Sequence, residues 1–198
     1  MNQKIQKLIA LLAVVVVVFG AVPAFSESFE TTLEKAQRGD AQAQYELGDM
    51  YAYGEDVGQD SNEAVKWFRK AAEQGHAPAQ FRLGCMYFNG KGVMQDDSEG
   101  VRWVRKSAEQ GYAEAQFNLA IAYHNGWGVR QDYSEAVRWY LKAAEQGHAE
   151  AQFNLGFRYF RGEGVRQDRS EAVFWWREAA QQGYIYAQDA LRQFGEKW

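Results

Sequence analysis

Residues 113–148 read AEAQFNLAIAYHNGWGVRQDYSEAVRWYLKAAEQGH, and the pattern of this 36-residue stretch decides the fold. The same frame starts four times in the 198-residue chain, at Ala41, Ala77, Ala113 and Ala149. Each copy opens with Ala-x-Ala-Gln and closes with Gln-Gly, and no insertion changes the spacing. A fixed period of this length is typical of stacked helical units that share one hydrophobic core.

Each copy predicts two helices. In the first copy Ala43, Leu47 and Tyr51 are spaced four residues apart, so they form one apolar stripe on a helix that we place over residues 41–53. A turn of the form Gly-x-Gly-Val follows, and its first glycine suits the left-handed conformation of a helix end. We call the helix before this turn helix A and the helix after it helix B.

Helix B begins after a repeated aspartate. Each of these aspartates has a glutamate three residues later, as Glu63 follows Asp60. The spacing predicts a capping box, in which the aspartate accepts from a free N–H of the first turn and the glutamate reaches back to the aspartate N–H. Each helix B also carries a tryptophan, which we expect in the core beside an alanine pair. These tryptophans are Trp67, Trp103, Trp139 and Trp175. The additional Trp176 is expected on the convex side.

Half units flank the four copies. Residues 31–39 repeat the second half of helix B, and residues 187–191 repeat the start of helix A. Terminal units of a repeat array present a polar outer face, which the charged residues near both ends suit. The predicted organisation is a signal peptide at 1–26, an N-terminal capping helix at 27–40, repeats at 41–76, 77–112, 113–148 and 149–184, and a C-terminal capping helix at 185–198.

The first 26 residues predict export. Lys4 and Lys7 precede an apolar run over residues 8–22, and small residues follow it. This order is that of a secretory signal, with cleavage after Ala24 or Ser26. The apolar run is short for a membrane span, so cleavage is favoured over an uncleaved anchor. The periplasm is the expected location, with secretion or an inner-membrane anchor as alternatives.

Composition argues against several functions. Loss of the two signal lysines leaves 20 basic against 26 acidic residues, so nucleic acid is not an expected partner. The single cysteine, Cys85, excludes an intramolecular disulfide and is expected as a small core residue. Three scattered histidines give no metal site, and His76 and His148 are expected as exposed turn residues. We predict no metal and no cofactor.

The repeated frame resembles the Sel1-like repeat family, a relative of the tetratricopeptide repeat. The resemblance covers about residues 41–183 and implies an all-α fold, a right-handed α/α solenoid with helix A on its concave side. It also implies scaffold or adaptor work, often in bacterial envelope or signalling assemblies. The departures are Asp56 in place of the second turn glycine, Ala120 in place of a helix A glycine, and Gly100 in place of a helix B alanine. Some members are cysteine-rich and linked to β-lactamase activity, and this chain lacks those cysteines.

Helix A carries a second stripe beside the packing one. Its members are Tyr45, Asp49 and Ala52 in the first copy, Phe81, Cys85 and Phe88 in the second, Phe117, Ile121 and His124 in the third, and Phe153, Phe157 and Phe160 in the fourth. These side chains either pack between successive A helices or line a concave groove for a peptide or partner helix. They vary between copies where the frame does not, as a recognition surface requires. The residues predicted to contact a partner are Phe88, His124, Asn125, Phe157, Phe160 and Arg161.

The favoured function is therefore a periplasmic scaffold that binds a protein or peptide, and not an enzyme. Serine catalysis of the β-lactamase kind needs motifs such as Ser-x-x-Lys and Lys-Thr-Gly, and neither occurs after residue 26. The alternatives are an envelope amide hydrolase of β-lactamase-like type and a binder of a small molecule or glycan. The sequence does not predict an oligomeric state.

Overall fold

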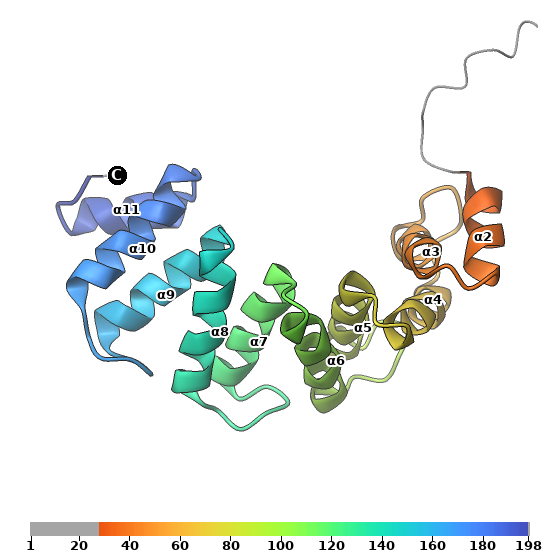
Figure 1. The fold of residues 1–198 in the computed structure, drawn as a ribbon, viewed down its shortest axis with the longest axis horizontal. Coiled ribbons are helices and arrows are strands. Elements are labelled where there is room, and N and C mark those ends of the chain that lie inside the picture. Colours follow the sequence, from red (N-terminus) through yellow and green to blue (C-terminus); the bar gives the residue numbers. More distant parts are fainter. Residues whose placement is uncertain (1–27, 198) are drawn as a thin grey trace, which may run out of the picture.

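The computed structural model describes residues 28–197, and this part of the chain is all-helical, with ten helices and no strand. The helices follow one another along an open, curved array with α2 and α11 at opposite ends (Figure 1). The A helices are α3 (Ala41–Tyr53), α5 (Ala77–Asn89), α7 (Ala113–Asn125) and α9 (Ala149–Arg161). The B helices are α4 (Ser61–Glu73), α6 (Asp97–Glu109), α8 (Tyr133–Glu145) and α10 (Arg169–Gln181). The single end helices are α2 (Phe29–Gln37) and α11 (Ile185–Gln193).

The prediction of an α/α solenoid is confirmed, and the helix predicted over residues 41–53 has those bounds. The predicted export signal lies outside the described residues. Within residues 28–197, no helix has the length and apolar character needed to cross a membrane.

The repeated aspartate caps helix B as predicted, but the glutamate does not reach back. Asp60 Oδ1 accepts from the N–H groups of Asn62 and Glu63 at 2.8 and 3.1 Å. The N–H of Asp60 instead donates to the carbonyl of Tyr51 at 2.9 Å, so it needs no second partner. Glu63 therefore pairs with Lys66, one turn further along α4. The second half of the predicted capping box is wrong for this reason.

In the last three repeats, the second glycine of the turn lets the backbone pack closely against the preceding repeat. Gly128 has φ 65°, and a Cβ built on it would lie 2.1 Å from the carbonyl oxygen of Asp97, the first residue of α6. Gly92 and Gly164 approach the start of the preceding helix B in the same way. In the first repeat Asp56 has φ 58° and its side chain is exposed, so the turn geometry is kept without glycine.

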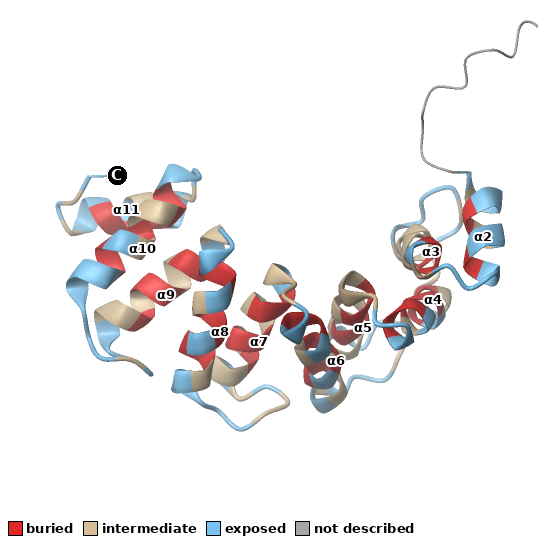
Figure 2. Ribbon diagram, in the orientation of Figure 1, coloured by how far each residue is buried: buried red, intermediate tan, exposed pale blue. Residues whose placement is uncertain are grey.

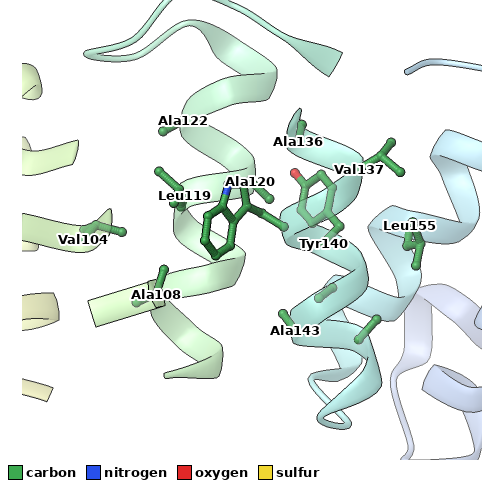
Figure 3. Packing of buried hydrophobic residues seen from close by; sticks show 14 of the residues in the cluster. Val104, Ala108, Leu119, Ala120, Ala122, Ala136, Val137, Tyr140, Ala143 and Leu155 are labelled. Carbon is green, nitrogen blue, oxygen red and sulfur yellow. The ribbon is translucent and has the colours of Figure 1, made fainter. Parts of the chain in front are cut away.

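The core lies between the A and B helices and runs the length of the array (Figure 2). The helix B position that buries the largest side chains is the residue after the repeated tryptophan, and it packs against the small residue of helix A. Its four occupants are Phe68, Val104, Tyr140 and Trp176, all 2% exposed or less. Figure 3 shows this layer where Leu119 and Ala120 of α7 lie between Val104 and Tyr140.

The expectation for Trp175 and Trp176 is therefore reversed. Trp176 is completely buried, because its ring occupies the space beside Gly156, where a Cβ would lie 2.5 Å from the indole. Its Nε1–H donates to the carbonyl of Phe153 at 3.2 Å. Trp175 is only half-buried, whereas Trp67, Trp103 and Trp139 are core as predicted.

The glutamines of the frame form a buried ladder that joins the repeats. The amide of Gln116 donates to the carbonyl of Ala108 at the end of the preceding helix B, at 3.1 Å. Its oxygen accepts from Gln146, which closes the same repeat, at 2.7 Å. Gln44, Gln80 and Gln152 make the same two hydrogen bonds. A single side chain thus joins three consecutive helices, and it adds a second hydrogen bond to a carbonyl that already accepts from the N–H of the glycine after the helix.

Candidate functional site

Two adjoining hollows open between consecutive A helices. The first, of about 550 Å³, lies between α3 and α5, and the second, of about 410 Å³, lies between α5 and α7. Cys85 and Asn89 line both hollows, so the two form one continuous surface that we call the A-helix groove. Its other lining residues include Ala52, Tyr53, Gln59, Met86, Phe88, Gln95, Asn118, Ile121 and Trp127, together with the charged residues Asp49, Arg82, Lys91 and Asp97.

The floor of the groove is apolar. The ring of Phe88 lies over Gly100, where a Cβ would come within 2.9 Å of the ring carbons, and this contact explains why α6 has glycine at that position. Cys85 is half-buried on the floor and is not the core residue that we expected. Burial raises the pKa of its thiol to about 11, so the thiol is protonated at neutral pH and is a poor nucleophile.

The rim of the groove carries amides. Asn89 and Asn118 each donate to a carbonyl four residues earlier in their own helix, at 2.7 and 2.9 Å. Neither amide oxygen accepts a hydrogen bond within the described residues. Trp127 stands beside them in the turn of the third repeat, with 53% of its surface exposed. The rim therefore offers hydrogen-bond acceptors and one aromatic face next to an apolar floor.

The predicted contact residues separate into three places. Phe88 lies in the A-helix groove. Phe157 and Phe160 pack on the buried ring of Trp176, with ring centroids 5.3 and 5.8 Å apart, and Phe160 also contacts Phe194 at 4.8 Å. In the fourth repeat these two rings therefore belong to an aromatic cluster with the residue that follows α11.

His124 lies in a polar cluster between α7 and α9. Its Nδ1 is 3.1 Å from Nη1 of Arg158, and its ring lies 5.2 Å from the ring of Tyr133. Arg158 also forms an ion pair with Glu163. Burial, and then the neighbouring Arg158 charge, lower the pKa of His124, so the ring is neutral at pH 7 and can accept a hydrogen bond from Arg158.

The remaining two predicted residues border this cluster. Arg161 is exposed and its Nη1 lies 3.5 Å from Oε1 of Glu163. Asn125 is the exposed last residue of α7. The cluster consequently contains more positive than negative charge, and only its outer members reach solvent.

His76 and His148 are capping residues and not exposed turn residues. Each is half-buried and lies at the N-terminus of a helix A, where its Nδ1 accepts from the N–H of Ala79 or Ala151 at 3.2 or 3.3 Å. The ring of His148 also stacks on Phe117 at 4.6 Å. Over residues 28–197, no group of three or more histidine, cysteine, aspartate or glutamate side chains is placed to hold a metal ion.

The Sel1 repeat family matches four consecutive segments of the chain, residues 41–76, 77–112, 113–148 and 149–184. The chain belongs to the Sel1 repeat family. Sel1 repeat proteins are generally non-enzymatic scaffolds, and their typical work is protein–protein interaction. No curated protein matches the chain in sequence.

Solved Sel1 structures share the fold. A protective antigen of uropathogenic Escherichia coli with an SLR fold is 43% identical, with a TM-score of 0.82 over 84% of this chain and 36% of the antigen. A Sel1 repeat protein from Oxalobacter formigenes is 37% identical, with a TM-score of 0.76 over 82% of this chain and 65% of that protein. The chain thus spans about a third and about two thirds of these relatives. The cysteine-rich protein B of Helicobacter pylori, 23% identical with a TM-score of 0.54, has a similar fold.

Two site residues of this Sel1 array were missed in the sequence. Trp127 occupies the variable turn position held by Glu55, Lys91 and Glu163 in the other repeats, and its exposure next to the groove follows only from the turn geometry. Arg158 occupies a position that is Met50, Met86 or Ala122 elsewhere. A charged residue at an otherwise apolar position was a signal that the sequence did offer.

Proposed function

We propose that this chain is an exported Sel1 repeat scaffold that binds an extended segment of a partner protein in the A-helix groove. The supporting observation is the continuity of the groove across α3, α5 and α7, with an apolar floor and an amide rim. An extended backbone offers N–H donors at regular intervals, which suit the free amide oxygens of Asn89 and Asn118. Alternate side chains of such a segment would occupy the apolar floor between them.

Trp127 is the residue best suited to test this proposal, because it is exposed and its loss should leave the fold intact. We expect Trp127→Ala to weaken partner binding by about tenfold, because tryptophans are among the residues that contribute most to interfaces. Met94 is a matched control, since it is 88% exposed in the turn of the second repeat but does not line the groove.

A photo-crosslinking amino acid placed at position 127 or at position 94 gives the direct measurement. We expect a partner to be captured from envelope fractions through position 127 and not through position 94. Equal capture from both positions, or unchanged binding by a correctly folded Trp127→Ala variant, would refute the groove. Thermal unfolding of each variant confirms that the array is intact.

Export is a separate part of the proposal. It rests on the order of basic, apolar and small residues in the first 26 positions. Mass spectrometry of the protein recovered from the periplasm should give a mature N-terminus at residue 25 or 27. Full-length protein confined to the cytoplasm would disprove export without affecting the groove.

A further inference from the structure

The outer surface of helix B differs between the last repeat and the first three. In each of the first three repeats a lysine three residues after the repeated tryptophan covers the indole ring. The ammonium nitrogens of Lys70, Lys106 and Lys142 lie 3.7, 4.3 and 4.0 Å from the ring centroids of Trp67, Trp103 and Trp139. These distances are those of a cation–π contact.

The fourth repeat lacks this lysine. Glu178 stands in its place, and Trp175 is half-buried where its three equivalents are 5–8% exposed. The face of one indole in four is thus uncovered, while the backbone around it keeps the same geometry.

A second change enlarges the uncovered surface. In the first three repeats the residue before the tryptophan is Lys66, Arg102 or Arg138, and it forms an ion pair with the glutamate three residues earlier. In the fourth repeat it is Phe174, which is 49% exposed and lies edge-on to Trp175 at 5.0 Å. Two basic side chains have been exchanged for an aromatic ring and a carboxylate.

The neighbouring groups determine which ligand suits this surface. A hollow of about 450 Å³ is lined by Phe174, Trp175, Glu178 and Glu145, together with the amides of Gln152, Gln181 and Gln182. Among these lining residues are two carboxylates and no basic side chain. Neither carboxylate has an ion-pair partner within the described residues.

We propose that the Trp175 surface binds the ammonium group of a lysine side chain on a partner protein. The chain itself shows the contact three times, with its own lysine as the cation. In the fourth repeat the Trp175 ring is kept, but Glu178 replaces the lysine. Because carboxylates lie beside the indole, we infer that the partner supplies the ammonium group. The site lies on α8 and α10, away from the A-helix groove, and does not rest on the function proposed for that groove.

The test uses a capped tetralysine peptide and the same peptide with every side-chain amine acetylated. The indole N–H resonance of Trp175, assigned with Trp175→Phe, should shift with tetralysine and stay unchanged with the acetylated peptide. Glu178→Lys restores the arrangement of the other repeats and should lower the affinity about two- to fivefold, the value of one exposed cation–π contact. Its thermal unfolding should match the wild type, because the same arrangement folds in three repeats.

Lys142→Glu is the reciprocal variant. It uncovers Trp139 and should create a tetralysine-dependent shift of the Trp139 indole resonance that the wild type lacks. Trp127→Ala, in the A-helix groove, should leave the Trp175 response unchanged, which separates this site from the groove. The proposal is overturned if the acetylated peptide gives the same shift, if Glu178→Lys binds as the wild type does, or if Lys142→Glu gains no response.

Discussion

The middle and the C-terminal end of this array differ in what surrounds the same helix A stripe. Between α3 and α7 the stripe lines an open groove, with Cys85 and Phe88 on its floor. In α9 the equivalent rings, Phe157 and Phe160, are half-buried and pack on Trp176, and Phe160 also contacts Phe194. The difference teaches that one position of the repeat can have different neighbours along the array. It lines an open hollow between α3 and α7, and it joins an aromatic cluster where the array ends.

The first prediction tests whether the C-terminal aromatic cluster is structural. Trp176→Ala should lower the free energy of unfolding by about 3–5 kcal/mol, because it removes a completely buried ring. Val104→Ala, at the same position of the second repeat, should cost only about 2 kcal/mol. Urea unfolding followed by far-UV circular dichroism measures both. Equal losses would show that the end of the array is packed no differently from its middle.

The second prediction concerns the turns that pack against the preceding repeat. Gly128→Ala should cost about 2–4 kcal/mol, since it combines a left-handed backbone with a Cβ that meets the carbonyl of Asp97. Asp56→Gly in the first repeat should change the stability by less than about 1 kcal/mol. Thermal unfolding of the two variants provides the comparison. A harmless Gly128→Ala would disprove the close approach of the turn to α6.

The third prediction compares an inner and a terminal rung of the glutamine ladder. Gln116→Ala removes two hydrogen bonds, the one it donates to the Ala108 carbonyl and the one it accepts from the Gln146 amide, and should cost about 1–3 kcal/mol. Gln188→Ala loses one hydrogen bond, to Ala180, and should cost about 1 kcal/mol or less. Denaturant midpoints at constant slope would measure both. If the terminal variant lost as much as the inner one, the second bond of each rung would contribute nothing.

The smallest expected effect is on the pH dependence of stability. Burial lowers the pKa of His76 and His124 in the folded chain, so the unfolded chain binds protons more readily. Stability should therefore be constant above pH 7.5 or so and fall as the pH drops through about 6.5.

His76→Asp is the control for the pH effect, because Asp40 caps α3 from the same position. The variant should keep the cap and show a weaker loss between about pH 7.5 and 5.5. A midpoint of urea unfolding that rises on acidification would contradict the expected loss of stability.

The helices of the four repeats could be predicted because the same residue pattern recurs in each of them. The spacing of Ala43, Leu47 and Tyr51 defines helix A, and the repeated aspartate defines the start of helix B. The burial of Trp176 was missed although the sequence carried a signal for it, because the same position is Phe68, Val104 or Tyr140 in the other repeats. The packing of Gly156 against its ring completes the explanation.

The candidate site was predictable only in part. The stripe containing Phe88 was found from its i, i+4, i+7 spacing, but the same spacing gave Phe157 and Phe160, which pack on Trp176. The contact of Phe160 with Phe194 involves a residue outside the four repeats, so no periodic argument could reveal it. The place of Trp127 beside the groove depends on the turn geometry, whereas Arg158 stood out as a charged residue at a position that is apolar in the other repeats.

The glutamine ladder has a consequence for how such proteins change in length. The four rungs at Gln44, Gln80, Gln116 and Gln152 use the same two bonds, one to the helix before the rung and one to the glutamine that closes its own unit. Duplication or deletion of one whole unit therefore preserves the hydrogen bonds of the remaining rungs. An array of this kind can become longer or shorter by whole units without a change in the residues that join them.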